Sequence, residues 1–393
     1  MTDPRSAARV VGVDIARFVA LAGMMATHIL PTFQDGTTEL TFAQSVAGGR
    51  ASALFAVLAG VSLALTSGRT RPVRGRAFVS VAAGVAVRAV LIAGIGLAIG
   101  KPDSGIAVIL TYYGVLFLLG IPFLMLRTPW LLALAALWLA VAPVIAHLVR
   151  PQLPARGYDN PSFESFADWE RLLSELTFTG YYPAVPWLAY LLVGLAIGRT
   201  DLTRWRAPVA LACVGGVLVA VSFAVSDALV RRPGVKDELA ESFGSTTALE
   251  QSLAEGTFGN TPTDSWWWLA VRAPHSATSF DLAHTIGSAL LVIAVCLVLG
   301  RLLPSFTAVL FGAGAVTLTL YTAHVLLRVE LWDDETLATY VGQLGAALAL
   351  GAVFALTQTR GPLEALVGAL SKLARRLVGG RPRPVDPDVG STS

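Results

Sequence analysis

Ten predominantly apolar stretches, each about 20 residues long, constrain the fold of this chain more than any other feature. A helix of about 20 apolar residues can cross the roughly 30 Å hydrocarbon core of a bilayer. The composition agrees, because 54% of the residues are hydrophobic, 14% are charged and the mean hydropathy is +0.65, whereas a soluble chain carries about 25% charged residues. These values exclude soluble enzymes and disordered proteins and predict an all-α, polytopic membrane protein with about ten transmembrane helices. The stretches are 10–32, 46–66, 77–100, 105–126, 129–148, 182–198, 207–230, 282–300, 306–328 and 337–357.

The distribution of basic residues predicts the orientation of these helices. If the N-terminus is cytoplasmic, the inner segments carry 17 Lys and Arg residues and the outer segments carry nine. An excess of basic residues marks the cytoplasmic loops of membrane proteins. We therefore expect cytoplasmic N- and C-termini in a multi-pass protein of the plasma (inner) membrane. No basic run interleaved with aromatic residues indicates a nucleic-acid partner.

The segments between the apolar stretches suggest one transmembrane domain with large outer loops. We expect this domain to cover residues 1–360, with long outer loops at 149–181 and 231–281. Loops of this length usually bind something or cover a site, although these two could also be passive caps. The Gly-, Pro- and Arg-rich tail 378–393 is predicted to be disordered in the cytoplasm.

A few ionisable residues interrupt the apolar stretches, and each is a candidate for function because charge is costly inside a bilayer. Asp14 and Arg17 are three residues apart in the first stretch and can pair on one helix face, which could also be a purely structural ion pair. Arg50 lies at the outer edge of the second stretch, where its side chain can reach the interface. Arg88 is nearly central in the third and has no obvious acidic partner, so an anionic ligand is plausible.

The first stretch also carries a histidine in line with its arginine. Arg17 and His28 are eleven residues apart, so they share a helix face and stand about 16 Å apart along the axis. A cation near the inner leaflet thus faces the same way as an imidazole near the outer side. This arrangement suits an anionic cytoplasmic donor whose reactive end reaches toward an acceptor outside, because an imidazole can take a proton or accept an acyl group.

Other candidate residues gather on the predicted outer side. All five histidines fall there, including His275 and His324, and no paired spacing such as HExxH supports a metal site, so no metal is expected. Tyr321 and His324 share a face and could line a cavity or simply pack. The run Trp266, Trp267 and Trp268 could stack on a sugar ring or form an interfacial aromatic belt.

At these residues the chain resembles the transmembrane acyltransferase superfamily. The spacing of Arg17 and His28 is similar to the Arg-x10-His of the acyltransferase-3 families. The bacterial heparan-alpha-glucosaminide N-acetyltransferase-like branch gives a broader likeness, which starts at Asp14-x-x-Arg17. The segments that carry it further are FAVLAGVSLAL (55–65), YYPAVPWLAYLLVGLAIGRTDL (181–202), APHSATSFDLAHTIGSALLVIAVCLVLGR (273–301) and GAGAVTLTLYTAHVLL (312–327).

The resemblance implies transfer of an acyl group, often acetyl, from cytoplasmic acetyl-CoA or another acyl-CoA to an extracytoplasmic sugar or glycan. His28 would be the general base or an acyl carrier, acting with Arg17. Arg17, Arg88 and Arg50 are the candidate donor-binding residues, and His275, Trp267, His324 and Glu39 are the candidates on the acceptor side. The heparan enzyme itself has Asn at the position of His28 and a catalytic His further on, where this chain has Glu39.

Two other functional classes fit the same sequence. A transporter or flippase would use Arg88 and the outer histidines to bind solute or relay protons, but the chain shows no internal repeat. A relative without catalysis could act as a scaffold of the cell envelope.

Overall fold

A computed structural model describes residues 10–157 and 159–379. This part of the chain is helical and contains no strand beyond one isolated bridge between Phe33 and Leu40. The elements in chain order are α1 (Val11–Ile29), α2 (Phe42–Ala47), α3 (Arg50–Thr66), α4 (Gly75–Gly100), α5 (Leu110–Gly120), η1 (Ile121–Met125), α6 (Thr128–Val149), η2 (Arg150–Gln152), η3 (Phe163–Asp168), α7 (Trp169–Ser174), η4 (Glu175–Thr179), α8 (Ala184–Gly198), α9 (Arg206–Val230), α10 (Val235–Glu241), α11 (Thr246–Glu255), η5 (Trp266–Ala270), α12 (Ser279–Leu302), α13 (Pro304–Leu310), η6 (Gly312–Ala315), α14 (Thr317–Glu330), α15 (Leu337–Thr357) and α16 (Pro362–Gly379).

Long apolar helices confirm the prediction of an all-α, polytopic membrane protein. In the described residues, seven helices are long and apolar enough to cross a bilayer: α1, α3 with its extension α2, α4, α6 with η2, α9, α12 and α15. The pair formed by 163–179 and α8 is bent by 47° and would make an eighth crossing if it is one span. The predicted stretches at 105–126 and 306–328 contain shorter helices, so a count of ten remains a prediction.

The stretch 306–328 is broken because glycines allow other helices to approach its backbone. It divides into α13, η6 and α14. A β-carbon on Gly314 would lie 1.8 Å from the carbonyl oxygen of Asp14 in α1, and one on Gly312 would lie 2.3 Å from the carbonyl oxygen of Gly351 in α15. Larger residues would keep α1 and α15 away from this segment.

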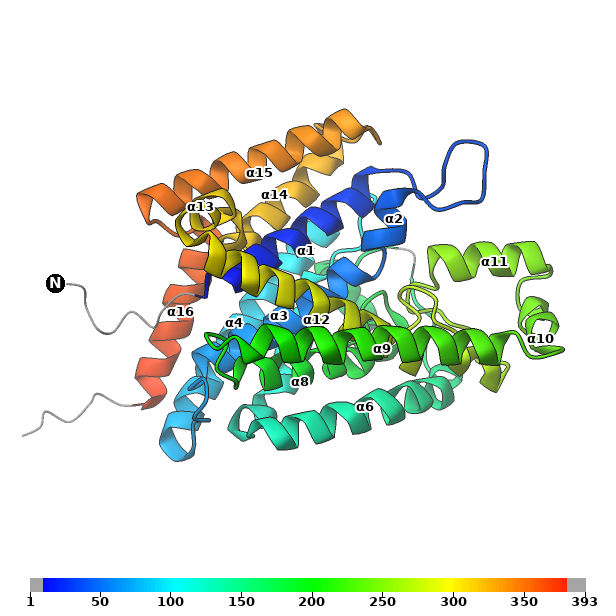
Figure 1. The fold of residues 1–393 in the computed structure, drawn as a ribbon, viewed down its shortest axis with the longest axis horizontal. Coiled ribbons are helices and arrows are strands. Elements are labelled where there is room, and N and C mark those ends of the chain that lie inside the picture. Colours follow the sequence, from blue (N-terminus) through cyan, green and yellow to red (C-terminus); the bar gives the residue numbers. More distant parts are fainter. Residues whose placement is uncertain (1–9, 158, 380–393) are drawn as a thin grey trace, which may run out of the picture.

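The central helices are packed by the same principle. Between α3 and α8, a β-carbon on Gly60 would lie 2.3 Å from the Leu191 carbonyl oxygen, and one on Gly194 would lie 1.9 Å from that of Val57. Small residues at such crossings let membrane helices approach closely. Two-thirds of the apolar window of α1, of α2–α3 and of α12 is buried, against 17% for α9 and α15. In Figure 1, α6, α9 and α15 accordingly lie on the outside of the bundle.

Arg199 and Arg301 link helix ends at the end of the bundle that lies near the start of α1 (Figure 1). Arg199 is buried and donates hydrogen bonds to the carbonyl oxygens of Ala64, Ser67, Arg69 and Leu124 and to the Ser67 hydroxyl.

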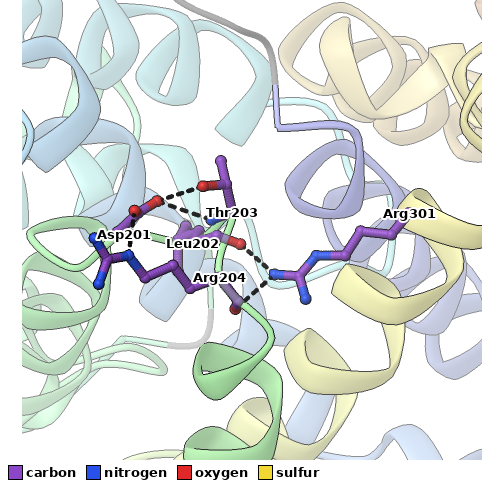
Figure 2. Close-up of polar contacts among 5 residues, drawn as sticks. All are labelled: Asp201, Leu202, Thr203, Arg204 and Arg301. Atoms are coloured by element: carbon purple, nitrogen blue, oxygen red, sulfur yellow. Dashed lines mark hydrogen bonds and ion pairs between the residues drawn. The ribbon is translucent and has the colours of Figure 1, made fainter.

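Arg301, near the end of α12, donates to the Leu202 and Arg204 carbonyl oxygens at 2.5 and 3.0 Å (Figure 2). The same turn is closed by Asp201, which accepts from Thr203 and Arg204. These contacts satisfy the carbonyl groups that helix ends leave free.

The two ends of the molecule differ. Helix α16 and the start of α1 lie at one end, and α10 and α11 lie at the other (Figure 1). The segments predicted as long loops, 149–181 and 231–281, carry short helices there, and Arg156 donates to the Phe258 carbonyl oxygen between them at 2.7 Å. Trp268 is fully buried among Val235, Leu239 and Leu249. Of the predicted tail 378–393, the first two residues complete α16 and the rest lies outside the described residues.

Candidate active site

A cavity of about 900 Å³ opens between α1, α3, α4, α5, α14, α15 and α16. Its volume is at the upper end of the range of about 300–1,000 Å³ that is usual for ligand sites. Its walls combine apolar side chains with five basic ones, and Glu364 is the one carboxylate among the described lining residues. The basic side chains are Arg17, Arg88, Arg360, Lys372 and Arg375.

The Arg17 side chain is held in place by hydrogen bonds to two neighbouring residues. Its guanidinium donates to Asp14 at 2.8 Å and to the Ser62 hydroxyl of α3 at 2.6 Å. The pair along one helix face is therefore formed as the spacing predicts. Arg17 also lines the cavity, so the ion pair can position a cation that faces a ligand.

Arg88 projects from the middle of α4 into the same cavity. Its guanidinium carbon lies 5.6 Å from the centre of the Phe117 ring, and its Nε has no hydrogen-bond partner among the described residues. A guanidinium whose buried Nε has no partner is suited to bind an anionic group. Arg88 therefore lines a cavity, and its role in binding an anionic ligand stays a prediction.

Two tyrosines are among the residues that line the cavity and are themselves nearly inaccessible. The Tyr113 hydroxyl donates to the Ser52 carbonyl oxygen at 3.3 Å, and the Tyr321 hydroxyl accepts from the backbone N–H of Ile109 at 3.3 Å. Tyr321 is one helical turn before His324 in α14, a rise of about 4.5 Å. The cavity wall therefore comes within one turn of a histidine.

His324 and His28 are in contact although they are 296 residues apart. Nδ1 of His28 lies 3.1 Å from Nε2 of His324, and the two rings are stacked with an interplanar angle of 8°. Nδ1 of His324 lies 2.7 Å from Oε1 of Gln343 in α15, whose Nε2 donates to the Trp332 carbonyl oxygen at 3.5 Å. His324 and Gln343 are buried, whereas His28 is partly exposed. We call these three side chains the histidine chain.

His275 lies in the loop before α12 and belongs to the opposite end from α16. Its ring is stacked on Phe258 and meets the edge of Tyr182, with 5.6 Å between ring centres in both cases. Nδ1 of His275 is buried and has no hydrogen-bond partner in the described chain. Burial lowers the pKa of His275 to about 4, so its imidazole is neutral at physiological pH. A neutral ring with a free Nδ1 can hydrogen-bond a polar ligand.

The remaining candidates lie away from the cavity. Arg50, at the start of α3, donates to the Ser45 carbonyl oxygen at 2.8 Å and does not line the cavity. Glu39 is exposed in the loop between α1 and α2. Of the three tryptophans, Trp266 is exposed and lies 4.8 Å from the His147 ring, Trp267 is partly buried and Trp268 is fully buried. Only Trp266 offers a largely exposed ring to a ligand or to the membrane interface.

Gln343 and the basic residues of α16 are not among the candidates predicted from the sequence. Gln343 is a polar residue in the otherwise apolar stretch 337–357, which is a signal of the kind that singled out Arg88. Helix α16 has apolar residues at Leu363, Leu366, Val367 and Leu370, the spacing of an amphipathic helix. In the described residues, no group of three or more His, Cys, Asp or Glu side chains is arranged to hold a metal ion.

The comparison with known families rests on the N-terminal half of this bundle. The family described as heparan-alpha-glucosaminide N-acetyltransferase, catalytic, matches residues 9–223, more than half of the chain. The chain belongs to this family. Membership makes it a multi-pass membrane protein of an acetyltransferase family whose enzymes use acetyl-CoA as donor. The match includes Arg17, His28 and Arg88 and ends before α14, α15 and α16. No curated protein matches the chain.

Proposed function

We propose that this protein transfers an acetyl group from cytoplasmic acetyl-CoA to a hydroxyl or amino group of a sugar or glycan on the outer side of the plasma (inner) membrane. The observation that carries the proposal is a cation-lined cavity whose wall comes within one helical turn of the histidine chain. In this orientation, α16 and the start of α1 face the cytoplasm, and α10 and α11 face outward.

The cavity fits the chemistry of this donor. CoA joins a phosphate-rich nucleotide to a long, largely uncharged arm that ends in the thioester. The cavity offers basic side chains together with apolar ones such as Leu58, Phe117 and Leu318. Arg17 and Arg88 would bind anionic or carbonyl groups of the donor, and the arm would extend toward Tyr321. No metal is needed for this transfer.

The hydrogen bonds of the histidine chain favour one protonation pattern. Gln343 donates through Nε2 to the Trp332 carbonyl, so its Oε1 faces His324 as an acceptor. Nδ1 of a neutral His324 then carries the proton, and its Nε2 accepts from Nδ1 of His28. Nε2 of His28 is left with a lone pair. This is the pattern that a general base needs.

The transfer then proceeds by direct attack. Nε2 of His28 takes the proton of the acceptor hydroxyl or amine. At the same time, the oxygen or nitrogen of the acceptor bonds to the thioester carbonyl carbon. The carbon–sulfur bond breaks, and the CoA thiolate receives the proton from His28. His275 lies in the loop before α12, on the outer side in this orientation, and its free Nδ1 would bind the acceptor. The exposed ring of Trp266 offers a face for a sugar.

Thiol release from acetyl-CoA by the purified protein tests this proposal. We expect slow release by the wild type, with water as acceptor, and a rate at least about 100-fold lower in His28→Ala, because a general base contributes about 10²–10⁴-fold. CoA binding and the gel-filtration profile should match between the two proteins. Equal release by His28→Ala would contradict the role of His28, and absence of both binding and release in the wild type would contradict the proposed function.

A further inference from the structure

We infer that α16 and the loop before it form the phosphate-binding wall of the cavity, with Lys372, Arg375 and Arg360 binding the phosphate groups of a nucleotide thioester. This inference rests on the proposed function, since it assigns one part of the donor to one part of the site. It concerns a helix outside the region that matches the family.

The first argument is that α16 is firmly docked on the bundle. Glu364, in its first turn, accepts from the backbone N–H groups of Leu318 and Thr319 at 2.7 and 3.1 Å and from the Thr319 hydroxyl at 2.5 Å. A carboxylate at the start of α14 satisfies free N–H groups and complements the helix dipole. At the other end of α16, the Ser80 hydroxyl of α4 donates to the Arg375 carbonyl oxygen at 2.7 Å.

The position of the Arg375 side chain is restricted by α4. A β-carbon on Gly84 would lie 2.5 Å from Cγ and 2.8 Å from Cδ of Arg375, so the arginine stem crosses the helix where no side chain is present. Arg375 is only partly exposed, and it lines the cavity together with Lys372 and Arg360. The glycine thus leaves room for the stem of Arg375 against α4, at a position where both residues line the cavity.

The charge balance of this wall favours an anionic ligand. Glu364 is the only acidic residue among the described lining residues, and its oxygens are already occupied by α14. No ion pair within the described chain involves Arg360, Lys372 or Arg375. Arginine and lysine side chains with free donors are the usual ligands of phosphate groups.

The same helix offers an internal control. Arg376 follows Arg375 in sequence and is exposed, as Lys372 is, but it does not line the cavity. Basic residues of an amphipathic helix at a membrane surface can also attract anionic lipids. If α16 acted only through such lipids, Arg376 would contribute as much as Lys372 and Arg375. If it binds the donor, the residues that line the cavity should differ from Arg376.

The test compares two donors that differ in their phosphate groups. Thiol release is measured with acetyl-CoA and with S-acetylpantetheine, which has the same thioester and no phosphate. The proteins are the wild type, Lys372→Gln/Arg375→Gln and Arg376→Gln, each in nanodiscs of zwitterionic lipid and in nanodiscs that also contain anionic lipid. We expect the double variant to raise KM for acetyl-CoA about 10- to 100-fold, with kcat and the KM for S-acetylpantetheine within twofold of wild type. Arg376→Gln should behave as wild type with both donors.

If the wild type releases thiol, each other outcome overturns the inference. Equal KM values for the double variant and the wild type would exclude phosphate binding by α16, and equal losses with both donors would show a general structural role. A loss that Arg376→Gln shares and that appears only with anionic lipid would assign α16 to lipid binding. Should the wild type release thiol from neither donor, the proposed function fails, and calorimetry with adenosine 3′,5′-bisphosphate decides the inference separately. Binding by the wild type that weakens at least tenfold in the double variant would support it, and equal or absent binding would refute it.

Discussion

At the scale of single residues, the amide of Gln343 determines which nitrogen of His324 carries the proton in the protonation pattern proposed above. Its Oε1 can only accept, so it holds the proton of His324 on Nδ1. We predict that Gln343→Leu lowers kcat for thiol release about 10- to 100-fold and leaves KM for acetyl-CoA within twofold of wild type, because the proposed base, His28, would lose its orientation while the proposed donor cavity would be unchanged.

Gln343→Glu is the matched control for this prediction. A carboxylate of nearly the same shape also accepts the Nδ1 proton, so we expect it to retain more than a third of the wild-type kcat. Steady-state kinetics of the three proteins separates a positioning role from a packing role. Equal loss of kcat in Gln343→Leu and Gln343→Glu would contradict the assigned direction of the chain.

His275 makes a second prediction at this scale, for stability against pH. Burial lowers its pKa to about 4 in the folded protein, whereas an exposed histidine in the unfolded chain titrates near 6.5. The unfolded state therefore binds more protons between pH 6.5 and 4, so the folded state loses stability as the pH falls through this window. The loss attributable to His275 at pH 5 is up to about 2 kcal/mol.

Thermal unfolding in detergent checks this prediction. His275→Gln removes the titrating group, so its Tm should fall less between pH 7 and pH 5 than that of the wild type. The two proteins should show the same dependence between pH 7 and pH 8, where His275 is neutral in both states. Parallel curves over the whole range would show that His275 is not responsible for acid sensitivity.

The residue-level interpretation of the sequence succeeded where neighbours lie on one helix. The three-residue spacing of Asp14 and Arg17 predicts their ion pair, and the structure contains it. The contact between His28 and His324 could not be predicted, because it depends on how α1 and α14 pack across 296 residues of chain. The roles of Arg50 and Glu39 remain predictions, and both residues lie outside the cavity.

At the scale of elements, the crossing of α3 and α8 carries the central packing. A β-carbon on Gly194 would lie 1.9 Å from the Val57 carbonyl oxygen, so the backbones of the two helices would have to separate. We predict that Gly194→Ala destabilises the folded protein by about 1–3 kcal/mol, the usual range for overpacking a core.

Gly216→Ala in α9 is the matched control, because a β-carbon there meets nothing within 4 Å. Alanine also has a higher helix propensity than glycine. We expect its Tm in detergent to equal or exceed that of the wild type, while the Tm of Gly194→Ala falls by several degrees. Equal Tm values for Gly194→Ala and the wild type would contradict the close crossing.

Hydropathy predicted the long apolar helices. Each of α1, α3, α4, α6, α9, α12 and α15 falls within or closely overlaps a predicted stretch. The break between α13 and α14 was not predicted. Glycines permit a break, but the break also depends on the close packing of α1 and α15 against this segment, which hydropathy does not show. Helix α16 was missed because its apolar residues cover one face only, which a search for continuous apolar stretches does not detect.

At the scale of the whole molecule, the proposed function requires the two ends to face different compartments. Cysteine labelling tests this orientation in a background with Cys213→Ala and Cys296→Ala. We predict that Glu241→Cys, at the exposed end of α10, reacts with a membrane-impermeant maleimide on intact cells, and that Arg376→Cys in α16 reacts only after permeabilisation. The reverse pattern would place the basic cavity on the outer side, away from cytoplasmic acyl-CoA.

The most direct test of the account follows the acetyl group across the membrane. Acetyl-CoA with a labelled acetyl group is added to inverted membrane vesicles whose exposed face is the cytoplasmic one and whose lumen holds the native glycans. With the wild type, label should accumulate in a sugar-containing product protected inside the vesicles, and with His28→Ala this accumulation should fall at least about 100-fold. Protected label that forms equally with His28→Ala, or label that never enters the lumen although the wild type binds acetyl-CoA, would contradict transfer through the histidine chain.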